Sequence, residues 1–304
     1  MKENFAARRS SLAEKVLDDS AIIIGSAPVK SRISDTDYAY RQDSNFYYLS
    51  GYEEPESLLL LRPGHNTEKF VIFCRDRDPL REQWDGFRSG QDGAVSNFGA
   101  DAAYSINAVD ELLPGMLDGI KNIYFSMSAP CGVDLKIKEC LELIRSNTRA
   151  GSEPPQNLLS LDSIIHEMRL LKEDIEIEIM KKAASITTEA HIRAMQAVKP
   201  GMYEYQLEAE YLYAFNKNGA RSPAYNSIVG GGHNSCILHY VENNSELIDG
   251  DLVLVDAGCE YRYYASDVTR TFPVTGKFSP EHTAIYSIVL EAHHQSMDQA
   301  VPGN

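Results

Sequence analysis

The fold of this chain is decided by residues 249–274, DGDLVLVDAGCEYRYYASDVTRTFPV. The apolar, β-branched run from Leu252 to Val255 follows an Asp-Gly-Asp turn and predicts a strand buried on both faces. This strand ends on a carboxylate, Asp256. A second carboxylate, Asp267, precedes the run from Val268 to Val274, which predicts a return strand.

Asp256 and Asp267 are therefore expected at the end of one strand and the start of the next. A charge at the end of a buried strand is costly unless a partner offsets it, and two facing carboxylates repel each other. One interpretation is a pair of metal-bridging ligands, because carboxylate oxygens bind Mn²⁺, Co²⁺, Zn²⁺ and Mg²⁺. The alternative is that the two aspartates cap turns or pair with Arg262 and Arg270. The spacing alone leaves both open.

Length and composition limit the class of protein. The chain has 304 residues, enough for two domains, and a net charge of −15 that argues against nucleic acid or an anionic membrane as partner. No run approaches the roughly 20 apolar residues of a membrane span, and residues 1–9 have no apolar core of signal-peptide length. The cysteines contain no CxxC pair, which fits a reduced cytosolic protein; they are Cys74, Cys131, Cys140, Cys236 and Cys259. We expect a soluble, cytoplasmic protein.

Residues 1–171 are expected to form an N-terminal α/β domain, because strand and helix patterns alternate along them. The apolar runs predict strands at 21–25, 46–49, 57–61, 70–73 and 123–125. Helical spacing predicts helices at 5–18, 109–117 and 134–144.

Residues 172–304 are expected to form a second domain. Helices are predicted from Lys172 to the Pro200-Gly201 pair and over Tyr203–Asn218, and strands over Tyr225–Val229 and Cys236–Tyr240. A last helix is predicted to begin at Pro280, its first helical residue, with Ser279 as the N-cap. Its predicted buried stripe consists of Ile285, Ile288, Val289 and Ala292.

Two further residues are candidates for function. If the strand ending near His239 lies beside the two-aspartate hairpin, this imidazole can donate to a developing oxyanion or transfer a proton. The alternative for His239 is a hydrogen-bonded, half-buried histidine. Trp84, the only tryptophan, lies among charged residues and is a candidate for contact with a ligand or partner, with partial burial as the alternative.

Three stretches together resemble the aminopeptidase P family, the Xaa-Pro aminopeptidases of the pita-bread metallopeptidases. They are residues 40–48 (YRQDSNFYY), residues 228–242 with CILHY, and residues 252–278 with both aspartates. The resemblance covers nearly the whole chain. It implies an α/β (α+β) protein with a mixed-sheet, creatinase-type (ribonuclease H-like) domain at 1–171 and a pita-bread catalytic domain from 172 to 304.

The resemblance also implies chemistry. It implies two divalent ions, usually Mn²⁺ with Co²⁺ or Zn²⁺ as alternatives, held by a set of ligands in which Asp256 and Asp267 match the two aspartates. His239 matches a histidine that contacts the substrate or transition state, and Trp84 remains a substrate-binding candidate. The implied activity is removal of the first residue from peptides with proline second, by a homo-oligomer (dimer or tetramer).

The chain departs from the family pattern after Asp267, where the family's metal-binding histidine, two glutamates and second substrate histidine have no counterpart. We therefore expect the catalytic domain to be incomplete, with weak metal binding and no aminopeptidase activity from these 304 residues alone. The alternatives are a Xaa-Pro dipeptidase (prolidase), which would share the same ligands, and a catalytically incomplete fragment or pseudoenzyme that acts through assembly.

Overall fold

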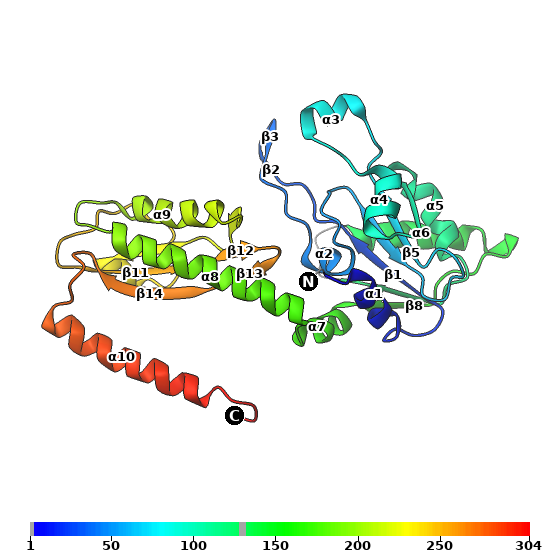
Figure 1. The fold of residues 1–304 in the computed structure, drawn as a ribbon. Helices are drawn as coiled ribbons and strands as arrows, with labels where there is room; N and C mark the ends of the chain where they lie inside the picture. Colours follow the sequence, from blue (N-terminus) through cyan, green and yellow to red (C-terminus); the bar gives the residue numbers. More distant parts are fainter. Residues whose placement is uncertain (1–2, 128–131) are drawn as a thin grey trace. The chain divides into compact units, whose positions relative to one another are not determined.

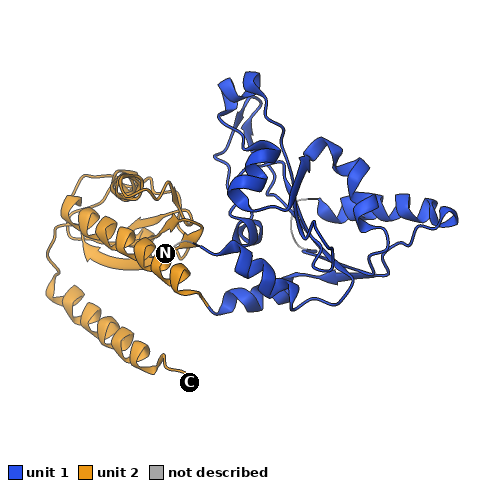
Figure 2. Cartoon of the chain, turned by 45° about the vertical axis from the view of Figure 1, so that its right-hand side comes forward, with its two compact units in different colours: residues 1–171 blue, residues 172–304 orange. Residues whose placement is uncertain are grey.

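A computed structural model describes residues 3–127 and 132–304, so Cys131 lies outside the described residues. The chain divides into two compact units, Met1–Leu171 and Lys172–Asn304 (Figure 2). The cysteines within the described ranges, Cys74, Cys140, Cys236 and Cys259, are free thiols. None of the helices in these ranges has the length and apolar character that spanning a membrane requires.

Unit 1 is built on a mixed sheet, of which Figure 1 labels β1, β5 and β8. Its strand order is β6-β5-β4-β1-β7-β8. Its strands are β1 (Ser20–Gly25), β4 (Leu58–Leu61), β5 (Phe70–Cys74), β6 (Ala102–Ser105), β7 (Asn122–Phe125) and β8 (Asn157–Ser160), with a separate hairpin of β2 (Ser31–Ile33) and β3 (Thr36–Asp37). Its α-helices are α1 (Phe5–Ala13), α2 (Ser44–Ser50), α3 (Pro79–Asp85), α4 (Gly90–Phe98), α5 (Val109–Leu117), α6 (Val133–Ser146) and α7 (Asp162–Leu170).

Both faces of this sheet are buried. Side chains alternate between the two faces of a strand, and in β1 the odd and even positions belong to different apolar clusters. Ile22 and Ile24 pack in one cluster, and Ala21 and Ile23 pack in the other. An unbroken apolar strand such as β1 therefore lies between two helical layers, which confirms the mixed α/β character expected from the sequence.

The strand predicted at Phe46–Leu49 is wrong, because this segment lies within helix α2. Asp43 is the N-cap of α2, and its carboxylate accepts hydrogen bonds from the backbone N–H groups of Asn45 and Phe46, both at 2.9 Å. Gly51 ends the helix in a left-handed conformation. The run of aromatic residues favoured a strand, but the caps at both ends decide for a helix.

Unit 2 contains two small sheets and three long helices. One sheet has the order β10-β11-β14 and the other the order β13-β12-β9. The elements are α8 (Asp174–Ala197), α9 (Glu204–Lys217), β9 (Ser222–Pro223), β10 (Ile228–Gly231), β11 (Leu252–Ala257), β12 (Cys259–Tyr261), β13 (Tyr264–Ala265), β14 (Val268–Pro273) and α10 (Pro280–Gln299). Residues of α8 and α9 share one apolar cluster with β11 and β14 (Figure 1).

Strand β11 is buried on one face, which corrects the prediction of two buried faces. Val253, Val255 and Ala257 are fully buried in the cluster under α8 and α9. The alternate residues Leu254 and Asp256 are only half-buried. The helices cover one side of this sheet, so the face that carries Asp256 lies away from the apolar cluster.

The prediction of a buried stripe on the last helix is also wrong. Ser279 caps α10 as expected, by accepting a hydrogen bond from the backbone N–H of His282 at 3.1 Å. None of the residues of α10, all of which the structure describes, is buried. Ile285, Ile288 and Val289 are each more than 60% exposed, because no described element packs over the apolar side of this helix.

Candidate metal centre

Asp256 and Asp267 lie on the same face of the β11–β14 hairpin. Asp256 is paired with Thr269 across the antiparallel ladder, so these two residues share a face. Asp267 precedes Thr269 by two residues and therefore points to that face as well. Asp256 is half-buried and Asp267 is exposed. The sheet thus places both carboxylates on the side away from α8 and α9.

The hydroxyl group of Tyr225 forms hydrogen bonds to both carboxylates. Its hydroxyl lies 2.5 Å from Asp256 Oδ1 and 3.0 Å from Asp267 Oδ1, so its one hydrogen is shared between them. Burial, followed by the hydrogen bond to Asp256, raises the pKa of Tyr225 above its ordinary value. The phenol therefore stays protonated, and a neutral hydroxyl separates two negative charges.

The donor set of this site fits a hard divalent cation only in part. Two carboxylates that converge on one point are suitable oxygen ligands for Mn²⁺, Mg²⁺ or Zn²⁺. Within the described part of the chain, no cluster contains three or more His, Cys, Asp or Glu side chains able to hold a metal ion. Water or further groups would therefore have to complete the coordination shell.

Pairing with arginine, one of the two alternatives given for these aspartates, is not what the geometry favours. The ion pairs of the described residues include neither Asp256 nor Asp267. The guanidinium group of Arg270 instead donates to the backbone oxygen of Thr269 at 2.8 Å. The phenol of Tyr225 is the group that contacts both carboxylates.

His239 lies on an exposed turn, so the predicted strand at Cys236–Tyr240 is wrong. A short 3₁₀ helix occupies Gly232–Cys236, and the chain then turns through residues 237–239 before the buried ring of Tyr240. Leu238, beside His239, is 89% exposed. The apolar run favoured a strand, but in the structure these side chains face outward and the backbone pairs with no neighbouring strand.

The loop that carries His239 is held by one buried carboxylate, Glu204, at the start of α9. Glu204 is fully buried. One of its oxygens accepts from the backbone N–H of Gly231 at 2.8 Å and from the amide of Asn234 at 3.0 Å. The other accepts from the hydroxyl of Tyr240 at 2.7 Å and from the backbone N–H of Ser245 at 2.9 Å. Four donors replace the water that a carboxylate loses on burial.

Trp84 lies in unit 1, on helix α3, and is 87% exposed. Leu80 on the same helix and Phe87 just beyond it are also largely exposed. The alternative of partial burial for Trp84 is therefore wrong, and its contact with a ligand or partner stays a prediction.

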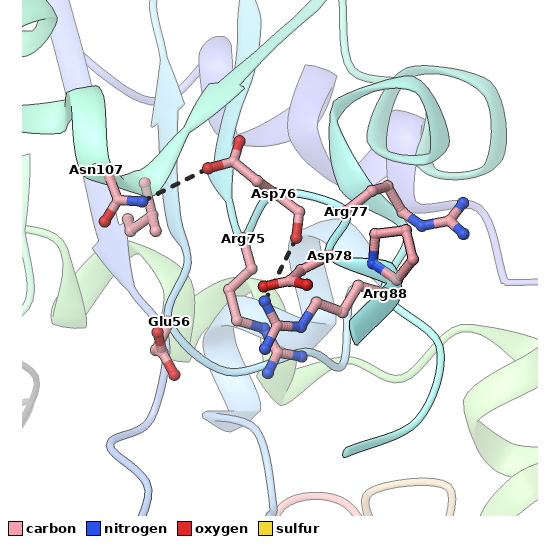
Figure 3. Close-up of a pocket in the computed structure, with 9 residues that line it drawn as sticks. Glu56, Arg75, Asp76, Arg77, Asp78, Arg88 and Asn107 are labelled. Atoms are coloured by element: carbon pink, nitrogen blue, oxygen red, sulfur yellow. Dashed lines mark hydrogen bonds between the residues drawn. The ribbon is translucent and has the colours of Figure 1, made fainter. Parts of the chain in front are cut away.

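A separate cavity of about 310 Å³ lies in unit 1 beside α3. Figure 3 shows Arg75, Arg77 and Arg88 around it together with Asp76, Asp78 and Glu56. The positive charges are already matched, because Arg75 pairs with Glu54 at 3.3 Å and Arg77 pairs with Glu82 at 2.5 Å. Arg88 pairs with Asp85 at 3.5 Å. The lining arginines therefore give the cavity no excess positive charge to attract an anionic ligand.

Sequence reasoning missed two residues of this region. Tyr225 was expected only as the first residue of a strand, but the observed strand begins at Ile228. Glu204 was expected only as an ordinary helix residue. No local pattern distinguishes either one, because the role of each depends on contacts with residues at least 27 positions away in sequence.

Comparison with known proteins identifies the class. Residues 178–304 match metallopeptidase family M24, and residues 5–124 match the aminopeptidase P N-terminal domain. The chain is 43% identical over 303 residues to the Xaa-Pro aminopeptidase of Escherichia coli (strain K12), covering 99% of this chain and 69% of that protein. It is 35% identical to human Xaa-Pro aminopeptidase 3, covering 94% of this chain and 56% of that protein.

Solved structures agree with this assignment. The aminopeptidase PepP of Pseudomonas aeruginosa superposes with a TM-score of 0.97 at 47% identity, over 98% of this chain and 68% of that one. A zinc-substituted E. coli aminopeptidase P in complex with product gives a TM-score of 0.93 at 44% identity, over 96% of this chain and 67% of that one. Fold and sequence thus define a two-domain M24 metallopeptidase. The chain belongs to the aminopeptidase P family, the Xaa-Pro aminopeptidases, as its sequence motifs predict.

Proposed function

We propose that this chain binds divalent metal through Asp256 and Asp267 and acts in removing the first residue from peptides whose second residue is proline. The observation that supports the proposal is the convergence of both carboxylates on the hydroxyl of Tyr225, in a chain so similar to Xaa-Pro aminopeptidases. The dipeptidase alternative is not favoured, because the relatives quoted above are aminopeptidases. Mn²⁺ is our proposed native metal, with Co²⁺ or Zn²⁺ as alternatives.

Each residue has a part in this proposal. Bound divalent ions would polarise the scissile carbonyl and lower the pKa of a coordinated water. Asp256 and Asp267 supply oxygen ligands from a fixed sheet, and Tyr225 orients the Asp256 oxygen that accepts its hydrogen bond. His239, exposed on its turn, is a catalytic and substrate-binding candidate that offers an N–H to the oxyanion. Trp84 offers an exposed ring for substrate contact. We further propose a cytoplasmic homo-oligomer, a dimer or tetramer.

The test is Mn²⁺ binding by equilibrium dialysis, with Asp256→Asn and Asp267→Asn as variants. We expect either substitution to abolish measurable binding. Asp249→Asn, on the exposed loop before β11, is the matched control and should bind as the parent does. Unchanged binding in both site variants would overturn the proposal.

Hydrolysis of a Gly-Pro-Xaa tripeptide and of a Gly-Pro dipeptide, with added Mn²⁺ and with EDTA, tests the substrate class. EDTA-sensitive cleavage of the tripeptide alone would support the aminopeptidase. Cleavage of the dipeptide alone would instead indicate a dipeptidase. Metal binding without cleavage of either peptide would contradict the proposed activity while leaving the proposed metal site intact.

A further inference from the structure

Two polar side chains on helix α8 bond to the residues on either side of Asp267. Thr187 and His191 are four residues apart and therefore lie on one face of the helix, one turn from each other. Thr187 is fully buried and His191 is 3% exposed. Thr187 contacts Ser266, the residue before Asp267, and His191 contacts Val268, the residue after it.

The contact at Thr187 fixes Ser266 at several points. The hydroxyl oxygens of Thr187 and Ser266 lie 2.6 Å apart. The backbone N–H of Cys259 donates to the hydroxyl of Ser266 at 3.0 Å and to that of Thr187 at 3.2 Å. The hydroxyl of Ser266 also donates to the backbone oxygen of Cys259 at 3.0 Å. Ser266 is thereby tied to α8 and to the strand that follows Asp256.

Close backbone packing adds to this restraint. A Cβ atom on Gly258 would lie 1.8 Å from the backbone oxygen of Ser266, far inside any allowed contact. Only glycine permits this approach. Because Gly258 is two residues after Asp256 and Ser266 is one residue before Asp267, the contact limits how far the two carboxylates can separate.

The contact at His191 fixes the other side of Asp267. Its Nε2 lies 2.9 Å from the backbone oxygen of Val268, and its Nδ1 lies 2.9 Å from the hydroxyl of Tyr211. A carbonyl oxygen only accepts, so Nε2 carries the hydrogen and Nδ1 accepts from Tyr211. The ring is held between α9 and β14, and the backbone of Val268 is held by the ring.

We propose that Thr187 and His191 are positioning residues for metal binding by Asp267, an inference that rests on the proposed function. Asp267 is itself exposed, and among the described residues the hydrogen-bond partner of its carboxylate is Tyr225. Its direction is therefore set by the backbone at 266 and 268, which these two side chains hold. Both are polar groups in an otherwise apolar cluster, where an aliphatic residue would avoid the desolvation cost. Groups that orient a ligand from outside the coordination shell typically change metal affinity 10- to 100-fold.

The experiment measures the Kd for Mn²⁺ by equilibrium dialysis and the electron paramagnetic resonance spectrum of bound Mn²⁺. Thr187→Val removes the hydroxyl at constant volume, and His191→Phe removes both ring nitrogens. We expect the Kd to rise about 10- to 100-fold in each variant, with a changed spectrum. Thr187→Ser and His191→Gln, which retain a hydroxyl and a donor to Val268, should restore the Kd to within about threefold.

Two controls separate positioning from general stability. Thr188→Val changes the neighbouring, exposed threonine, whose hydroxyl bonds within the helix to Ala184, and should leave the Kd unchanged. Ile186→Val trims a buried residue of the same helix and should lower the urea midpoint with no effect on the Kd. If Thr187→Val and His191→Phe behave like Ile186→Val, the inference is overturned. If Asp267→Asn leaves the Kd unchanged, it is the proposed function that fails.

Discussion

The β11–β14 hairpin and the loop between β10 and β11 both carry candidate site residues, but they are held in different ways. In the hairpin, a continuous antiparallel ladder from Leu252–Pro273 to Ala257–Val268 fixes Asp256 and Asp267 through the backbone. The loop that carries His239 is held largely by the side chain of Glu204. The first kind of restraint is spread over many bonds, whereas the second is concentrated on one buried group. Each can be broken by a single substitution.

The largest effect is expected from Gly258→Ala in the hairpin. The new methyl group would lie 1.8 Å from the backbone oxygen of Ser266, and backbone cannot move aside as a flexible side chain does. We expect a loss of about 3 kcal/mol or more in the free energy of unfolding of unit 2, measured by urea denaturation.

Gly250→Ala is the matched control. Gly250 has open space around it but a φ of +88°, so alanine there costs only backbone strain, about 1 kcal/mol. A Gly258→Ala protein no less stable than Gly250→Ala would show that the close approach in the hairpin does not determine its stability.

The next effect is expected from Glu204→Gln, which acts on the loop. Four donors meet the two carboxylate oxygens of Glu204, whereas an amide offers one oxygen and one NH₂ group. Some of these donors must lose their acceptor, which should lower the free energy of unfolding by about 1–3 kcal/mol. Hydrogen exchange at the backbone amides of Gly231 and Ser245 should become faster, by the factor that this loss of free energy corresponds to.

Glu208→Gln on the same helix is the control, because Glu208 is only partly buried and accepts from one side chain, the amide of Asn243, at 3.0 Å. It should change stability by less than about 0.5 kcal/mol. Equal exchange rates in the Glu204→Gln and parent proteins would contradict the view that this carboxylate holds the loop.

The same contrast explains how much could be predicted from sequence. The hairpin was predictable, because main-chain pairing leaves a local signal: an apolar β-branched run, a turn and a second run. The loop was not, because residues 236–240 have the apolar character of a strand while their conformation depends on Glu204, more than 30 positions earlier. Tyr225 was missed for the same reason, since its hydrogen bonds to Asp256 and Asp267 form only where three distant segments meet.

The caps and the last helix give two further cases. Asp43 and Gly51 are the helix caps around Phe46–Leu49, and the prediction, which was based on the aromatic run, did not take them into account. The apolar stripe of α10 was read correctly as a periodicity and wrongly as burial, because amphipathic spacing predicts a face and not the element that covers it. Local chemistry thus predicts element type better than it predicts partners.

A smaller effect is expected from pH, through His191. Burial, the largest cause, lowers the pKa of His191 below its ordinary value; Arg270 lowers it further, and Asp256 and the backbone oxygen of Val268 act in the opposite direction. Between that lowered pKa and about 6.5, the unfolded chain binds a proton that the folded chain does not. The contribution of His191 to the free energy of unfolding is therefore complete above about pH 6.5. It decreases as the pH falls below this value, by at most about 1.4 kcal/mol per pH unit for one proton.

The measurement is urea unfolding from pH 5 to 8 for the parent and for His191→Gln. Other titrating groups contribute to both proteins and cancel in the difference. The difference between the two free energies should change below about pH 6.5 and be constant above it. A flat difference over the whole range would show that His191 has the same proton affinity in both states.

The smallest effect on stability is expected from His239→Ala, and this gives the sharpest contrast between holding a site and acting in it. His239 is exposed on its turn, so its removal should change the free energy of unfolding by less than about 0.5 kcal/mol and leave the Kd for Mn²⁺ unchanged. If the imidazole donates to the oxyanion, the substitution should nevertheless lower kcat by about 10²- to 10³-fold in any form of the enzyme that turns over a Gly-Pro-Xaa peptide.

His233→Ala, on the same loop and also exposed, is the control and should leave kcat unchanged. A loss of bound Mn²⁺ with normal turnover per bound ion would instead make His239 a metal ligand, and an exposed turn would then be part of the metal centre itself.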